Sequence, residues 1–105
     1  MNIPNKVKIG WKHYDVEQKE IDSSLVSDYT ELFGQVFFGE QKIFINQSYD
    51  AGQRECTLLH ESIHAMDDMC GIGLQEDQVK MLGHAMYAFI RDNPGVFDSG
   101  GDALD

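Results

Sequence analysis

The residues best suited to chemistry form the motif His-Glu-Ser-Ile-His over positions 60–64. On a helix, residues four positions apart stand one above the other, about 40° apart around the axis, so His60 and His64 direct two imidazoles at one point. Neutral imidazole is a common zinc ligand, and a catalytic zinc site normally keeps a fourth position for water. Glu61 is placed to take a proton from that water. The motif therefore predicts a zinc site with His60 and His64 as ligands and Glu61 as the general base.

A third protein ligand must come from outside the motif. Glu76 is the preferred candidate, because it follows His64 across a glycine-containing turn, and a second helix folding back would bring its carboxylate to the metal. Its helical phase agrees, since Glu76 precedes Val79 by three residues on the face expected to look inward. We therefore expect the ligand set His60, His64 and Glu76.

Three residues after the motif leave alternatives open. Asp68 continues the spacing of four, although it is rotated by about 80° from His60 around the helix axis. Cys70 stands where a metzincin has its third histidine, but Asp67 replaces the glycine needed at the preceding turn, so we expect Cys70 in the core. Asp67 lies close to the line of both histidines, where a carboxylate could orient an imidazole, unless it is simply solvated.

Hydrolysis would also need a donor for the charge that develops in the transition state. The sequence offers four candidates and does not choose among them: Tyr14, Tyr49, His84 and Tyr87. Two of them, His84 and Tyr87, lie roughly 12 and 16 Å along a helix from Glu76 at 1.5 Å per residue. We therefore expect a surface role for His84 and a core role for Tyr87.

The motif needs a helix, and the surrounding residues predict one over 51–69. Asp50 and Gln53 resemble a capping box, and apolar residues recur at helical spacing after them. Gly71 and Gly73 are expected to end this helix, since glycine readily adopts the left-handed conformation found at many helix C-termini.

A second helix is expected from near Gln75 to Pro94. Acidic residues occupy its first turn, where the helix dipole favours them, and proline cannot continue it. Its inward face is expected to carry four apolar residues: Val79, Leu82, Met86 and Phe89.

Strands are predicted before the first helix. Residues 7–16 mix β-branched and aromatic residues with polar ones and predict a strand, whereas periodicity does not decide the structure of residues 17–31. Residues 34–46 contain two β-rich runs separated by a glycine-containing turn, which indicates a hairpin.

Composition limits the class of protein and its partners. The chain of 105 residues fits one domain, taken as residues 1–97, followed by a flexible acidic tail over 98–105. Eighteen acidic and eight basic residues give a charge of -10, which disfavours nucleic acid and anionic membranes. The chain has no transmembrane stretch or signal-peptide pattern, so we expect the cytoplasm, with Cys56 and Cys70 as thiols.

Two stretches, Thr57-Leu-Leu-His-Glu-Ser-Ile-His-Ala-Met-Asp67 and Leu74-Gln-Glu-Asp-Gln-Val-Lys-Met-Leu82, resemble small phage-type zinc peptidases. These proteins look like trimmed relatives of the ImmA/IrrE and SprT-like groups. The resemblance covers residues 7–94, although only the His-Glu-x-x-His core is highly specific. It implies a gluzincin site with zinc bound by His60, His64 and Glu76 and with Glu61 as the general base. It also implies the cytoplasm of the host if the chain is phage-encoded.

Two departures from those groups concern the substrate. Position 68 is not the histidine of SprT-like proteins, and the chain has no accessory domain that binds DNA or a repressor. In relatives on mobile elements the target is typically a regulatory protein, so cleavage of a repressor is implied by kinship alone. The sequence does not indicate the oligomeric state.

The expected fold is an α+β minimal zincin. A small, mainly antiparallel sheet of about three strands would pack on the motif helix, and the second helix would close the metal site. Zincins often hold a peptide as an added strand, so the run Lys42–Asn46 would be the substrate edge if it is exposed.

The expected function is hydrolysis of a peptide bond in a peptide or protein substrate by a zinc metallopeptidase. Two rivals remain at this point. One is a catalytically inactive phage protein that binds zinc and acts by binding a host protein, and the other is a small module without metal. The inactive protein would have a filled fourth coordination position and no turnover.

Overall fold

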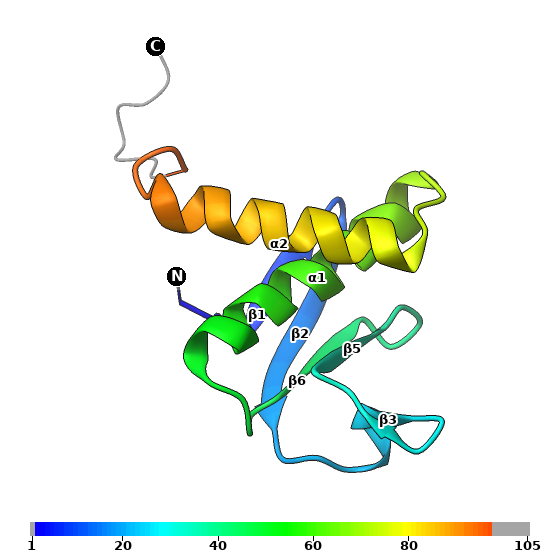
Figure 1. Ribbon diagram of the computed structural model, residues 1–105. Coiled ribbons are helices and arrows are strands. Elements are labelled where there is room, and N and C mark those ends of the chain that lie inside the picture. The colour runs from blue at the N-terminus through cyan, green and yellow to red at the C-terminus, as the bar shows by residue number, and fades with distance from the viewer. Residues whose placement is uncertain (1, 98–105) are drawn as a thin grey trace.

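The chain folds into three layers: a sheet, a helix on one face of the sheet, and a second helix across the first (Figure 1). The computed structural model describes residues 2–97, so the expected tail over 98–105 lies outside the described residues. The fold belongs to the α+β class, as the sequence predicted. The elements in chain order are β1 (Lys6–Ile9), β2 (Lys12–Lys19), the 3-10 turn η1 (Ser23–Leu25), β3 (Val26–Ser27), β4 (Thr30–Glu31), β5 (Gly34–Phe37), β6 (Lys42–Asn46), α1 (Ala51–Cys70) and α2 (Glu76–Asp92).

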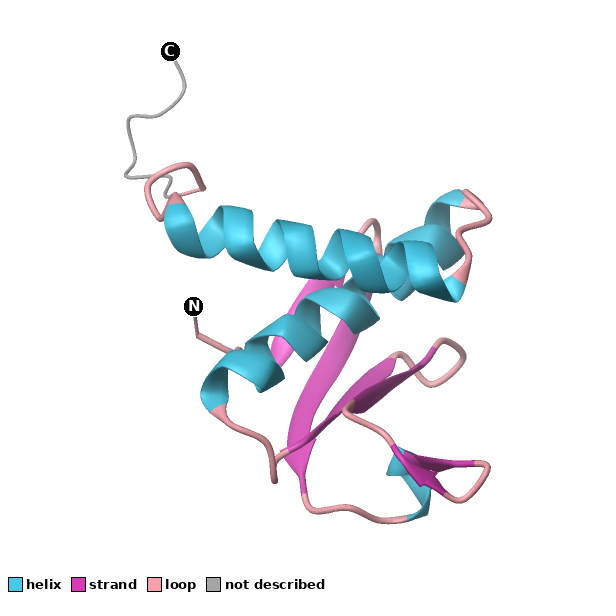
Figure 2. Cartoon of the chain, in the orientation of Figure 1, coloured by secondary structure: helices cyan, strands magenta, loops and turns pink. Residues whose placement is uncertain are grey.

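The main sheet has four strands in the order β1-β2-β6-β5 (Figure 2). Its two outer pairings are antiparallel and the central pairing of β2 with β6 is parallel, so the sheet is mixed and has four strands where the sequence predicted about three. The parallel pair arises because residues 20–33 cross from the end of β2 to the start of β5 instead of reversing in a tight turn. The predicted hairpin over 34–46 is confirmed as β5 and β6.

Two expectations about the strands were wrong. The single strand over 7–16 is split by a turn at Gly10, whose φ of +62° suits a residue without a side chain, and β1 and β2 therefore form a hairpin. Strand β6 lies inside the sheet between β2 and β5, so Lys42–Asn46 is not an edge. The free edge on that side belongs to β5.

The segment over 17–31, left open by the sequence, contains several short elements. It contributes the end of β2, the turn η1 and a separate two-stranded ribbon of β3 and β4. Asp28 and Tyr29 form the tip of that ribbon, both with positive φ. Residues with side chains adopt this conformation in the tight turns that match the twist of a hairpin.

The hydrophobic core lies between α1 and the sheet. Alternate side chains of the strands point to this face, and α1 buries one stripe against them. The core cluster consists of Ile9, Tyr14, Val16, Ile43, Ile45, Leu58 and Ala65. Burial of one face of α1 in this cluster fixes the direction in which its opposite face points.

Helix α1 begins and ends close to its predicted bounds. The Asp50 side chain accepts a hydrogen bond from the backbone N–H of Gln53 at 2.8 Å, and Gly71 ends the helix with a φ of +65°. The long helices are amphipathic, and within residues 2–97 no helix is long and apolar enough to cross a membrane.

Helix α2 packs on α1 with a narrower face than the sequence predicted. Val79 is buried as expected, but Leu82 and Phe89 are 43% and 47% exposed. The second buried residue is Gly83, where a Cβ would lie 3.5 Å from the Cα of His60. A helix that rests on a single crossing helix buries a thinner stripe than one that covers a sheet, which explains the exposed residues.

The close approach of β5 to α1 is testable at Gly34. A Cβ at this position would lie 2.5 Å from Cγ2 of Thr57 and 2.8 Å from the carbonyl oxygen of Phe44. We expect Gly34→Ala to lower the free energy of unfolding by about 1–3 kcal/mol, because backbone must move to admit the methyl group. Gly39→Ala is the matched control, since nothing lies within 4 Å of its Cβ. Urea unfolding measures both, and equal effects would contradict the close packing.

Candidate metal centre

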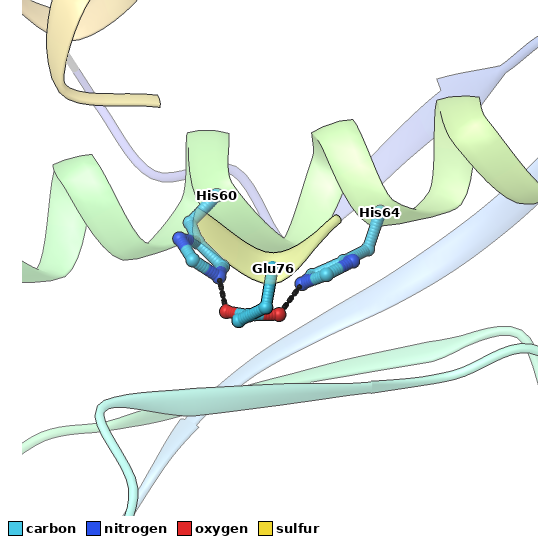
Figure 3. Close-up of side chains that lie close together, drawn as sticks. All are labelled: His60, His64 and Glu76. Atoms are coloured by element: carbon cyan, nitrogen blue, oxygen red, sulfur yellow. Dashed lines mark hydrogen bonds and ion pairs between the residues drawn. The ribbon is translucent and has the colours of Figure 1, made fainter. Parts of the chain in front are cut away.

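Three of the predicted site residues meet where the start of α2 passes the middle of α1 (Figure 3). The Nε2 atom of His60 lies 2.8 Å from Oε1 of Glu76, and Nε2 of His64 lies 2.8 Å from Oε2 of the same carboxylate. The possible ligand atoms of the three residues all lie within 4.8 Å of one another. The structure therefore brings together the three side chains that the sequence selected as ligands.

The turn between the helices positions Glu76. The Asp67 carboxylate accepts hydrogen bonds from the backbone N–H groups of Gly73, at 2.7 Å, and Leu74, at 3.3 Å. Gly71 and Gly73 both have positive φ, which lets the chain reverse within five residues. Glu76 is then the first residue of α2, where the helix dipole also favours a carboxylate.

Asp67 therefore has a role that differs from both alternatives left open by the sequence. It lies on the turn rather than against an imidazole, so it acts on the placement of Glu76 rather than on either histidine. The signal for this role in the sequence was the pair Gly71 and Gly73. A turn with left-handed residues leaves backbone N–H groups unpaired, and a nearby carboxylate can accept hydrogen bonds from them.

The donor set fits a zinc ion. Two imidazole nitrogens and one carboxylate are a ligand set that zinc takes in catalytic sites, with a further position left for water. Tetrahedral coordination at 2.0–2.1 Å places ligand atoms roughly 3.3 Å apart, a value between the 2.8 Å contacts with Glu76 and the 4.8 Å limit that encloses all three residues. The histidine side chains are 21% and 24% exposed and that of Glu76 is 69% exposed, so the cluster is open to solvent.

Glu61 has a buried carboxyl group beside this cluster. The residue is 7% exposed and lines the adjoining groove. Burial, with a smaller effect from the charge of Glu76, raises its pKa to about 8, although a hydrogen bond from the backbone of Val36 acts in the opposite direction. Burial is also the main cause that lowers the pKa of His60. The chain thus holds a proton-exchanging group in a poorly solvated place next to two imidazoles.

A groove of about 520 Å³ adjoins the cluster. Its walls come from three elements: the segment Leu32, Phe33 and Gly34 before and in β5; Gln53, Cys56, Thr57, His60 and Glu61 on α1; and Glu76, Lys80 and His84 on α2. The groove gives access to the cluster, because His60, Glu61 and Glu76 all line it.

The alternative ligands lie elsewhere. The carboxylate of Asp68 pairs with Nζ of Lys12, the first residue of β2, at 3.9 Å. Cys70 is exposed at the end of α1, so its expected core position is wrong, because the helix end projects beyond the core cluster. Cys56, by contrast, is half-buried and lines the groove, and burial raises the pKa of its thiol.

Among the four expected donors, only His84 lines the groove. Tyr14 is fully buried in the core, the Tyr49 hydroxyl donates to Glu31, and the Tyr87 hydroxyl donates to Glu55 at 2.9 Å. The sequence had a signal for His84, because its spacing of eight residues from Glu76 places both on one face of α2. Lys80, four residues from Glu76, lies on the same face of α2 between them and also lines the groove.

Comparison with known proteins does not identify the site. No protein-family model matches this chain, and no curated protein or solved structure matches it either. The function must therefore be inferred from the arrangement of its own side chains.

The role of Asp67 in the turn is testable by unfolding. We expect Asp67→Ala to destabilise the protein by about 1–3 kcal/mol, because two backbone N–H groups lose a charged acceptor. Asp67→Asn keeps one acceptor oxygen and is expected to have a smaller effect. The control is Asp68→Ala, whose long and partly exposed ion pair with Lys12 should contribute less than about 1 kcal/mol. Denaturant unfolding of the three variants measures the difference, and equal losses for Asp67→Ala and Asp68→Ala would refute the assignment.

Proposed function

We propose that this chain is a zinc-dependent metallopeptidase with a minimal zincin fold that hydrolyses a peptide bond in a protein substrate. The observation that carries the proposal is that His60, His64 and Glu76 converge from two helices. Glu61, which follows His60 in the chain, places a buried carboxyl group beside them. An ion-pair cluster alone would account for the contacts of Glu76. It would not account for the buried carboxyl group of Glu61, which lines the groove beside these residues.

The residues have distinct roles in this proposal. His60, His64 and Glu76 hold the metal, which when bound supplies a Lewis acid and lowers the pKa of water toward ~7. Glu61 takes the proton of the attacking water and delivers it to the leaving amine. Glu61 suits this exchange by its position, because its buried side chain lines the groove directly beside His60 and Glu76.

Strand β5 is the element best placed to hold the peptide. The backbone carbonyl of Phe33 accepts from the N–H of Asn46 at 2.8 Å, and Gln35 and Phe37 continue this pairing with β6. In an antiparallel pair, alternate residues point their backbone groups the other way, so Gly34 and Val36 face the outer edge of β5 near α1. The backbone of Val36 already bonds the Glu61 carboxyl there, so a peptide would share or replace that bond. A peptide added to that edge would run past the groove and the metal ligands.

The expectation that Phe44 or Ile45 contacts the peptide changes accordingly. Ile45 is fully buried in the core, and the ring of Phe44 lies 5.5 Å from that of Phe37. These residues support β5 from the neighbouring strand and do not form its outer edge.

Metal content tests the ligand set directly. We expect about one zinc per chain in protein purified without chelator, and its loss or weakening in His64→Ala and Glu76→Ala, because each removes one of three ligands. Asp77→Ala is the matched control, since it removes a neighbouring exposed carboxylate outside the cluster. Elemental analysis of the four proteins measures the outcome. A wild-type chain without zinc, even after zinc is added back, would exclude the proposal.

Catalysis by Glu61 is tested by a variant that leaves the ligands in place. We expect Glu61→Gln to keep zinc and to lower peptide hydrolysis roughly 100-fold or more, because the amide cannot accept the proton. Mass spectrometry of a mixed peptide library detects the new chain ends, whichever peptide is cleaved. Full zinc without hydrolysis in the wild type would instead favour the inactive, zinc-binding protein, and undiminished hydrolysis by the variant would remove Glu61 from the mechanism.

A further inference from the structure

Lys80 is a positive charge on the wall of the groove without a partner in the described part of the chain. It is exposed on α2 one helical turn after Glu76, and no ion pair joins it to another residue of 2–97. A glutamate four residues before a lysine normally pairs with it on a helix. Here both oxygens of Glu76 lie 2.8 Å from histidine nitrogens, so the usual partner of Lys80 is engaged elsewhere.

The position of this charge is unusual in an acidic protein. The chain has 18 acidic and only 8 basic residues, yet Lys80 is the only lysine or arginine among the described residues that line the groove. His84 lines the same wall one turn further along α2, and Leu32 and Phe33 line the groove from the segment before β5. The groove therefore combines hydrogen-bond donors on α2 with apolar side chains from another element.

The distances along the two backbones define which part of a peptide would meet Lys80. Four residues of helix separate Lys80 from Glu76 by about 6 Å, and an extended peptide advances about 3.3 Å per residue. For a peptide that runs alongside α2 in the groove, a group bound by Lys80 would thus belong to a residue on the order of two positions from the bond at the metal.

We propose that Lys80 makes the groove specific for a substrate carboxylate located close to the scissile bond, with His84 as a second donor and an apolar neighbour against Phe33. This inference rests on the proposed function. The carboxylate can come from an Asp or Glu side chain or from the end of a peptide, because both present the same two oxygens to an ammonium group.

The net charge of -10 restricts the substrate further. Repulsion from the whole protein acts over distance and is screened beyond about 8 Å at physiological ionic strength, whereas Lys80 acts at contact. A single carboxylate in an otherwise neutral or basic segment can bind Lys80 at contact without strong repulsion from the acidic protein as it approaches. A polyacidic peptide would be repelled before it reached the groove.

Peptidyl hydroxamates test the proposal by binding, since the hydroxamate anchors on zinc and the attached residues occupy the groove. Three probes share one backbone, hydroxamate-Leu-X, in which X is Glu amide, Gln amide or Gln with a free carboxyl end. We expect at least one carboxylate probe to bind the zinc-loaded protein roughly fivefold more tightly than the Gln amide probe, which calorimetry measures. The probe that gains affinity identifies the source of the carboxylate.

Three lysine variants distinguish direct contact with Lys80 from the effect of the protein's net charge on affinity. Lys80→Met should abolish the preference and Lys80→Arg should retain it, whereas Lys8→Met, on β1 at the opposite edge of the sheet, should leave it unchanged. The preference should also decline as salt is raised. Zinc content is measured for every variant, so that loss of the metal is not mistaken for loss of recognition.

The outcomes distinguish the two proposals. Equal affinity for all three probes in a zinc-loaded wild type, or a preference that survives Lys80→Met, overturns the role of Lys80 while the metallopeptidase proposal stands. A wild type that binds neither zinc nor any hydroxamate overturns the metallopeptidase proposal, and the recognition of a carboxylate falls with it.

Discussion

The reversal of the chain between α1 and α2 is the constraint on which the site depends. Two imidazoles on one helix can point at a common position by spacing alone. The third group comes from α2, so α2 must cross α1 at the level of the two histidines. The Asp67 carboxylate fixes the position of this crossing, because it accepts hydrogen bonds from the backbone N–H groups of Gly73 and Leu74 just before α2 begins. A shift of one residue in the turn would rotate Glu76 by about 100° and move its carboxylate away from both histidines.

The core supports the same arrangement from the other side of α1. Leu58 and Ala65 belong to the buried cluster with the strands, while His60 and His64 lie on the opposite face of the helix. Glu61 lies between these two faces, and this explains how a carboxyl group comes to be buried and yet lines the groove. Its raised pKa is therefore a consequence of its position on α1 rather than of a special local sequence.

Local patterns were sufficient to predict what local interactions determine. The bounds of α1, the hairpin of β5 and β6, and the meeting of His60, His64 and Glu76 follow from caps, glycines and helical phase. The parallel pairing of β2 with β6 has no such local signal, because it joins residues far apart in the chain.

Other features depended on packing partners that the sequence does not specify. The exposure of Leu82 and Phe89 reflects a helix that rests on one neighbour instead of a sheet. The same holds for Cys70, which is helical as expected but extends past the core. Lys80 was overlooked because a lysine four residues after a glutamate is ordinarily read as its surface partner.

The parallel pairing at the centre of the sheet has a consequence for the order in which the chain assembles. The hairpin of β1 and β2, the hairpin of β5 and β6, and the pair of helices each join segments that are neighbours in the chain. Among the strand pairings within residues 2–97, only that of β2 with β6 joins segments distant in the chain, and contacts of high sequence separation form slowly because a long loop must close first. The three groups at the centre lie within residues 60–76, inside the helical pair. We therefore expect the helical pair that brings His60, His64 and Glu76 together to form quickly, before β2 pairs with β6 and completes the sheet.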